Sequence, residues 1–167
     1  MGNVNDYEVE IQDGYGISDF PVQRVMAAIR YVLSRHEATP GSELTVVVTS
    51  DEQVRQMNAQ YRSVDAVTDI LSFPADPLPA EIEGEAPYLG DLIIAYPYTA
   101  HQAQEAGHSL DDELVLLVIH GTLHLLGFDH DNEANQDAMW REQSDALAAA
   151  GVAIDVPRFT FEDDRDT

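Results

Sequence analysis

The chain of 167 residues contains no cysteine and no lysine. Without cysteine it can form no disulfide, no thiolate metal site and no cysteine nucleophile. Eight arginines carry all the positive charge of its side chains, and 31 acidic residues bring the formal net charge to −23 at pH 7. Because nucleic-acid phosphates attract Lys and Arg, this composition argues against DNA binding, and any RNA contact must rely on a local patch, metal ions or a partner.

A long apolar run is also missing. No stretch approaches the roughly 20 apolar residues that a membrane-spanning helix needs. The first ten residues, MGNVNDYEVE, hold neither a basic region nor an apolar segment, so we expect no signal peptide. Asp6 stands where a myristoylation signal requires Ser or Thr. These absences predict a cytoplasmic protein that has no membrane partner.

The length and a hydrophobic content of 44% suit one compact domain with a sizeable core. We assign this domain to residues 1–154 and interpret residues 155–167, which end in EDDRDT, as an acidic tail that is loosely held. The acidic segment 75–87, broken by prolines, is typical of a surface loop.

Hydrophobic periodicity and turn residues divide the domain into strands, found mostly early, and helices, found mostly late. This order indicates an α+β fold, in which about four strands form a small sheet covered by about five helices. We expect strands at 4–11, 44–49, 66–73 and 89–95, and helices from Ser18 or Asp19 to 36, from 50 to 61, from 97 to 106, from 109 onward, and from 131 or 132 to 150.

Side-chain spacing suggests which faces of the first two helices point inward. In the first helix, Val22 and Ile29 belong to one apolar face. In the second, Ser50 and Gln53 form a capping box, and we expect Tyr61 to point into the core with the other apolar residues of its face. We place Arg62 in the loop that follows, where an arginine is either a surface charge or a binding group held by the scaffold.

The most informative stretch is HGTLHLLGFDH, residues 120–130. The six residues before it, 114–119, are all apolar, which is typical of a buried helix. His120 and His124 are four residues apart and therefore leave the same face of that helix. Gly127 is suited to end the helix in the left-handed conformation, so that the chain can turn and bring His130 back toward the other two rings.

Three imidazoles on a helix and the following turn predict a metal site at the end of the buried central helix. Catalytic Zn²⁺ commonly has three protein ligands and one open position. The alternative, that each histidine is a hydrogen-bonded core residue, explains the spacing less well. The offsets 0, 4 and 10, with glycine at 7, match those of zinc peptidases, but Gly121 replaces the glutamate that serves those enzymes as general base. Peptide hydrolysis by that route is therefore not expected.

The motif and its surroundings resemble the YbeY family of bacterial rRNA maturation factors, described as metal-dependent endoribonucleases. Besides HGTLHLLGFDH, the segment MNAQYRSVDAVTDILSFP (57–74) is similar to a second block of that family. LGDLIIA (89–95), followed by QAQEAGHSLDDEL (102–114), is similar to a third. Together the similarity covers most of residues 44–150.

The resemblance implies a small mixed sheet with helices and a single-strand endoribonuclease that acts in 16S rRNA 3′-end maturation and ribosome quality control. It implies one Zn²⁺, or another divalent transition metal, on His120, His124 and His130, and a functional role for Arg62. Single-stranded rRNA, the small ribosomal subunit and assembly proteins would be the partners.

A mechanism follows as a hypothesis. Zinc held by three neutral imidazoles can activate water or polarise a phosphoryl oxygen, while Arg62 pairs with the phosphate. Asp129 either orients an imidazole or accepts a proton, or else only bonds local backbone as turn aspartates do. We expect His101 and His108 to be non-ligands near the surface.

Two other functions stay open at this stage. The chain could be a metal-dependent hydrolase of a substrate other than RNA. It could also be a ribosome-assembly adaptor with a structural zinc, which usually has four protein ligands.

Overall fold

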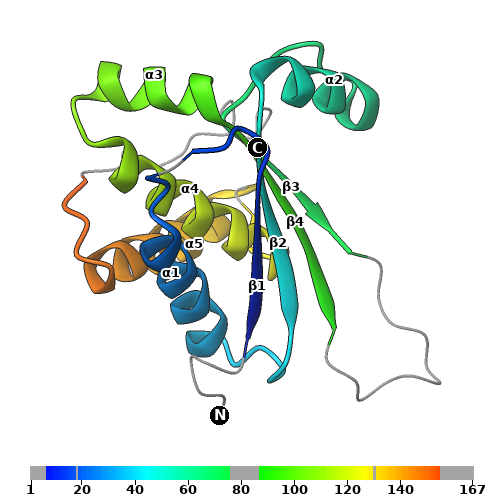
Figure 1. Ribbon diagram of the computed structural model, residues 1–167. Helices are drawn as coiled ribbons and strands as arrows, with labels where there is room; N and C mark the ends of the chain where they lie inside the picture. Colours follow the sequence, from blue (N-terminus) through cyan, green and yellow to red (C-terminus); the bar gives the residue numbers. More distant parts are fainter. Residues whose placement is uncertain (1–6, 18, 76–86, 130, 155–167) are drawn as a thin grey trace.

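The computed structural model describes residues 7–17, 19–75, 87–129 and 131–154. Within these ranges the chain forms one sheet and five helices (Figure 1). The elements in chain order are β1 (Glu8–Asp13), α1 (Val22–Arg35), β2 (Glu43–Thr49), α2 (Asp51–Arg62), β3 (Ile70–Pro74), β4 (Tyr88–Ala95), α3 (Tyr96–Ala106), α4 (Leu110–Leu125) and α5 (Glu133–Ala149).

The sheet has four strands in the order β1-β2-β4-β3. β1 pairs in parallel with β2, and β2 pairs in parallel with β4. β3 pairs with β4 in the antiparallel sense. The sheet is therefore mixed, and the α+β fold predicted from the sequence is confirmed.

The larger part of the core lies between the sheet and three helices. α1, α4 and α5 lie together on one side of the sheet (Figure 1). α4 is enclosed by its neighbours, and Leu114, Val118 and Leu123 are almost completely buried. The apolar stretch before the histidine motif thus forms a core helix, as predicted, and it ends at the candidate site.

A smaller apolar cluster supports α2. Val54 of α2 packs with Leu71 of β3 and with Ile93 and Ala95 of β4, and all four are buried. Because side chains alternate along a strand, Leu71 and Ile93 point away from the face that carries α4. α2 is in this way fixed to the sheet over β3 and β4.

Several element boundaries differ from the prediction. β1 ends at Asp13, two residues later than predicted. α1 begins at Val22 rather than at Asp19, and Val22 is 38% exposed instead of belonging to the core. Ser18, the other predicted cap, lies outside the described residues.

β3 begins at Ile70, four residues later than predicted, and includes Pro74. The preceding segment forms a loop, because the Asn58 side chain donates a hydrogen bond to the Ala66 carbonyl at 2.9 Å and the Val64 amide donates to the Asn58 carbonyl at 3.2 Å.

Other helix ends agree with the sequence. Ser50 and Ser109 accept hydrogen bonds from the amides of Gln53 and Asp112, each at 3.0 Å, and so cap α2 and α4. Among the described residues, no helix is both long enough and apolar enough to cross a membrane. The tail 155–167 and most of the loop 75–87 lie outside the described residues.

Candidate metal and phosphate site

Two of the predicted metal ligands lie together in the last turns of α4. The Nε2 atoms of His120 and His124 are 3.1 Å apart, and the ring centroids are separated by 4.7 Å with an interplanar angle of 77°. His120 is buried at 6% exposure, whereas His124 is half-buried. The two rings therefore turn their Nε2 atoms toward one point. This point is accessible from the side of the half-buried His124.

Glycine ends α4 as expected. Gly127 has φ = +100° and its amide donates to the His124 carbonyl at 3.0 Å. The Phe128 amide donates to the Leu123 carbonyl, also at 3.0 Å. This pair of bonds is the Schellman motif, which reverses the chain and satisfies carbonyls of the last helical turn. The prediction for Gly127 is confirmed.

The donor set fits a divalent transition metal. Zn–N distances of 2.0–2.1 Å and tetrahedral angles place two ligand nitrogens roughly 3.3–3.4 Å apart, close to the 3.1 Å between the Nε2 atoms of His120 and His124. His130, the third predicted ligand, lies outside the described residues. Within the described ranges no three metal-binding side chains converge, so the full ligand set remains a prediction.

Gln143 of α5 contributes to the site and was not anticipated from the sequence. Its Oε1 lies 2.9 Å from Nδ1 of His120, and its side chain is 1% exposed. An amide oxygen only accepts hydrogen bonds, so Nδ1 donates and Nε2 of the neutral ring keeps its lone pair. No local sequence pattern indicates this contact, because Gln143 and His120 are 23 residues apart.

Gly121 packs against the sheet. A Cβ atom there would lie 2.8 Å from Cδ2 of Leu92 and 3.1 Å from Cδ1 of Ile70. A glutamate at this position would begin inside an apolar contact between α4 and the strands. The absence of a glutamate at this position thus has a packing reason.

Arg62 and Asp129 lie at the same cavity as His124. This open cavity has a volume of about 520 Å³ and is lined by Tyr61, Arg62, Ser72, Phe73, Pro74, His124, Gly127, Phe128 and Asp129. Three of the predicted site residues, drawn from α2, α4 and the turn after α4, are thereby brought together. Their chemical roles remain predictions.

The positions of Arg62 and Tyr61 correct the sequence interpretation. Arg62 is the last residue of α2 and not part of the following loop. Tyr61 is 62% exposed, although it was expected in the core. Ser63 ends the helix with φ = +61°, so both side chains project from a helix terminus beside the cavity.

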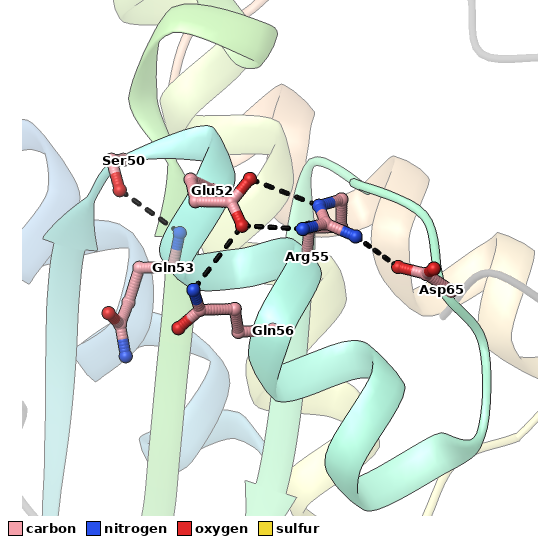
Figure 2. A network of polar contacts seen from close by, with 6 residues as sticks. All are labelled: Ser50, Glu52, Gln53, Arg55, Gln56 and Asp65. Carbon is pink, nitrogen blue, oxygen red and sulfur yellow. Dashed lines mark hydrogen bonds and ion pairs between the residues drawn. The ribbon is translucent and has the colours of Figure 1, made fainter.

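A polar network holds this terminus. Figure 2 shows the Arg55 guanidinium between the carboxylates of Glu52 and Asp65. Arg55 donates to Glu52 at 2.6 and 3.1 Å and to Asp65 in the loop after α2. Arg55 thereby lowers the pKa of the Glu52 carboxyl from its ordinary value. The network ties the loop to α2, and the role of Arg55 in it is structural.

A second polar cluster lies near the N-terminal end of α4. Gln102 of α3 donates to Asp69 at 3.0 Å and to Glu113 at 2.6 Å, and His108 pairs with Glu113. Burial raises the pKa of Asp69, and the nearby Glu113 charge acts in the same direction.

One of the two histidines that were expected to be non-ligands belongs to this cluster. His108 is half-buried in it, and His101 is exposed beside Glu105. Glu113 and His124 are eleven residues apart, about 16 Å along a helix, so the cluster is separate from the candidate site.

Comparisons with known proteins point to one family. The family model described as Endoribonuclease YbeY matches residues 9–151. A Gloeobacter violaceus protein named Endoribonuclease YbeY is 45% identical over 117 residues, which is 69% of this chain and 60% of that protein. A Shouchella clausii protein of the same name is 35% identical over 153 residues, covering 87% of this chain and 96% of that protein.

A solved structure supports the fold alone. The solution structure of TM1509 from Thermotoga maritima superposes with a TM-score of 0.58 at 22% sequence identity, covering 85% of this chain and 88% of that one. The family match spans β1 to the end of α5 and includes the histidine motif. The chain therefore belongs to the endoribonuclease YbeY family.

Proposed function

We propose that this chain is a metal-dependent endoribonuclease that cleaves single-stranded RNA during maturation of the 16S rRNA 3′ end and in ribosome quality control. The observation that carries the proposal is the convergence of His124, Arg62 and Asp129 on one cavity, with Nε2 of His120 3.1 Å from Nε2 of His124. The names of the family and of the relatives support the same reaction.

In this proposal one Zn²⁺, or another divalent transition metal, binds His120, His124 and His130. When bound, the ion would supply Lewis acidity and acidify coordinated water. Gln143 would hold the His120 ring in the tautomer that leaves Nε2 for the ion. The protein would therefore provide a site whose nitrogens are aligned before the metal arrives.

The remaining residues act on the RNA. Arg62, fixed at the end of α2, would pair with a phosphate oxygen and stabilise the charge that grows on it during cleavage. Asp129 is exposed at the cavity rim, where its carboxylate can accept a proton or orient the neighbouring imidazole. Small-subunit rRNA and assembly proteins would be the partners, in the cytoplasm.

A cleavage assay tests this proposal. A single-stranded RNA that carries the 3′ end of a 16S precursor is incubated with zinc-loaded protein, with chelated protein and with protein to which zinc is restored. We expect cleavage to stop on chelation, to return with zinc, and to be absent in His124→Ala. Cleavage that continues in the chelated protein and in His124→Ala would refute a metal-dependent nuclease.

A further inference from the structure

Tyr61 exposes its side chain to an unusual degree. It is 62% exposed, while the other large exposed hydrophobic residues of the described chain lie between 36% and 45%. Its neighbour one helical turn earlier, Met57, packs against the small apolar cluster under α2. Removing the surface of an aromatic ring from water is favourable. A ring that stays exposed is therefore available to a ligand.

The ring of Tyr61 is also held in place. It contacts Phe73 of β3 in an edge arrangement, with ring centroids 5.4 Å apart and an interplanar angle of 69°. Ser63 ends the helix two residues after it, and the Arg55–Asp65 ion pair ties the following loop to α2. Because the ring is already positioned, little side-chain entropy is lost when a ligand packs on it.

Tyr61 stands beside the groups that would handle a phosphate. Tyr61, Phe73, Arg62 and His124 line the same cavity of about 520 Å³. The cavity therefore places aromatic surface next to a guanidinium and an imidazole. A nucleotide combines a flat base with an adjacent phosphate, and so matches this pairing of aromatic surface and positive charge.

Because the protein is strongly acidic, an uncharged contact is important for its affinity for RNA. Arg24, Arg35 and Arg55 are all engaged with acidic side chains of the protein itself. With a net charge of −23, attraction between the whole surface and phosphates cannot supply the affinity. Base stacking on an aromatic ring depends little on charge and is a common source of affinity for single strands.

We infer that Tyr61, supported by Phe73, stacks one unpaired base of single-stranded RNA next to the phosphate bound by Arg62. The inference rests on the proposed function and adds to it the residue that selects for an accessible base. A base inside a duplex is covered on both faces by its neighbours, so the platform favours single strands over double strands.

Binding of a 2′-O-methyl single strand of about 12 nucleotides, measured by fluorescence anisotropy with the zinc-loaded protein, tests the inference. Tyr61→Ala should raise Kd roughly 5- to 150-fold, the range expected for the loss of one stacked base. Tyr61→Phe keeps the ring and should bind within about twofold of the unchanged protein. The slope of log Kd against log salt should be the same in all three, because no phosphate contact is altered.

Tyr15→Ala is the matched control, because Tyr15 is also exposed, at 45%, and contacts Tyr96 rather than the cavity. It should bind as the unchanged protein does. An equal Kd for Tyr61→Ala, or a loss in Tyr61→Phe as large as in Tyr61→Ala, would overturn the stacking role. If the unchanged protein fails to bind the strand at all, the proposed function itself is wrong, and that outcome is distinct from the first two.

Discussion

The amide oxygen of Gln143 lies 2.9 Å from Nδ1 of His120, and both side chains are buried. The contact joins α5 to α4, two elements separated by the turn that carries Asp129. Because it fixes which ring nitrogen bears the proton, it prepares Nε2 of His120 to bind a cation. A core glutamine in this way orients a ring of the candidate site.

Replacing Gln143 with leucine should weaken zinc binding. The volume is nearly kept, but the acceptor for Nδ1 is lost, and changes of this kind typically reduce metal affinity 10- to 100-fold. Gln143→Glu retains an acceptor oxygen and should bind zinc nearly as tightly as the unchanged protein. Zinc affinity is measured by competition with a chromogenic chelator, and the tautomer of His120 by ¹⁵N NMR of its ring.

Gln102→Leu is the control for Gln143→Leu. Gln102 also makes enclosed hydrogen bonds, to Asp69 and Glu113, so its loss should destabilise the fold. It lies in the cluster away from the candidate site and should leave zinc affinity unchanged. If both leucine variants lose zinc affinity equally, the effect comes from general destabilisation and Gln143 has no positioning role.

Arg62→Ala should reduce kcat for RNA cleavage roughly 100- to 1,000-fold, which is typical of losing one donor to a developing oxyanion. Arg62→Lys should recover only part of the rate, because an ammonium keeps the charge but lacks the planar two-pronged donor geometry. Single-turnover cleavage of the same RNA measures both variants.

Arg24→Ala controls for the loss of one positive charge. Arg24 pairs with Asp112 at the N-terminal end of α4, far along that helix from His124. Its removal should leave cleavage essentially unchanged. Equal losses in Arg24→Ala and Arg62→Ala would mean that net charge matters and that Arg62 has no specific contact with the phosphate.

Gly121→Ala should destabilise the protein although alanine favours helices. The new methyl group would meet Leu92 at 2.8 Å, and overpacking of a core typically costs about 1–3 kcal/mol. The gain in helix propensity is about 1 kcal/mol, so the free energy of unfolding should fall by up to about 2 kcal/mol. Urea unfolding provides the measurement. A variant stabilised by the full helix-propensity gain would show that α4 does not pack so closely on β4.

Asp69 gives a prediction about pH. Burial raises its pKa in the folded protein above the ordinary carboxyl value. Between the unfolded and folded pKa values the folded state binds the extra proton, so the contribution of Asp69 to stability falls as pH rises through that window. Asp69→Asn does not titrate, and the unchanged protein should therefore gain stability relative to this variant on going from about pH 7 down to the ordinary carboxyl pKa.

Thermal unfolding of both proteins across this pH range measures the difference in stability, in which the titration of carboxyls that do not interact with Asp69 cancels. A stability difference that is constant with pH, or that changes in the opposite direction, would contradict a raised pKa at Asp69.

The sequence predicted those parts of the fold and site that depend on local spacing. His120 and His124 meet because residues four apart share a helix face, and Gly127 ends α4 because few other residues adopt its positive φ easily. Caps at Ser50 and Ser109 follow from the same kind of short-range rule.

Features that depend on tertiary packing were missed. Periodicity assigned Tyr61 to the core, but its ring contacts Phe73 of the edge strand β3 and remains largely exposed. Gln143 reaches His120 across 23 residues of sequence, a contact that no local pattern encodes. Gly121 was noted only as a missing glutamate, and its packing against Leu92 appears only when α4 is placed on the sheet.

The central claim is that one divalent metal ion bound by the histidines of α4 and the following turn makes this chain a nuclease. Elemental analysis of the purified protein tests it most directly, with His120→Ala and His124→Ala analysed alongside. We expect about one transition-metal ion per chain in the unchanged protein and almost none in either variant. Equal metal content in all three proteins would contradict the claim.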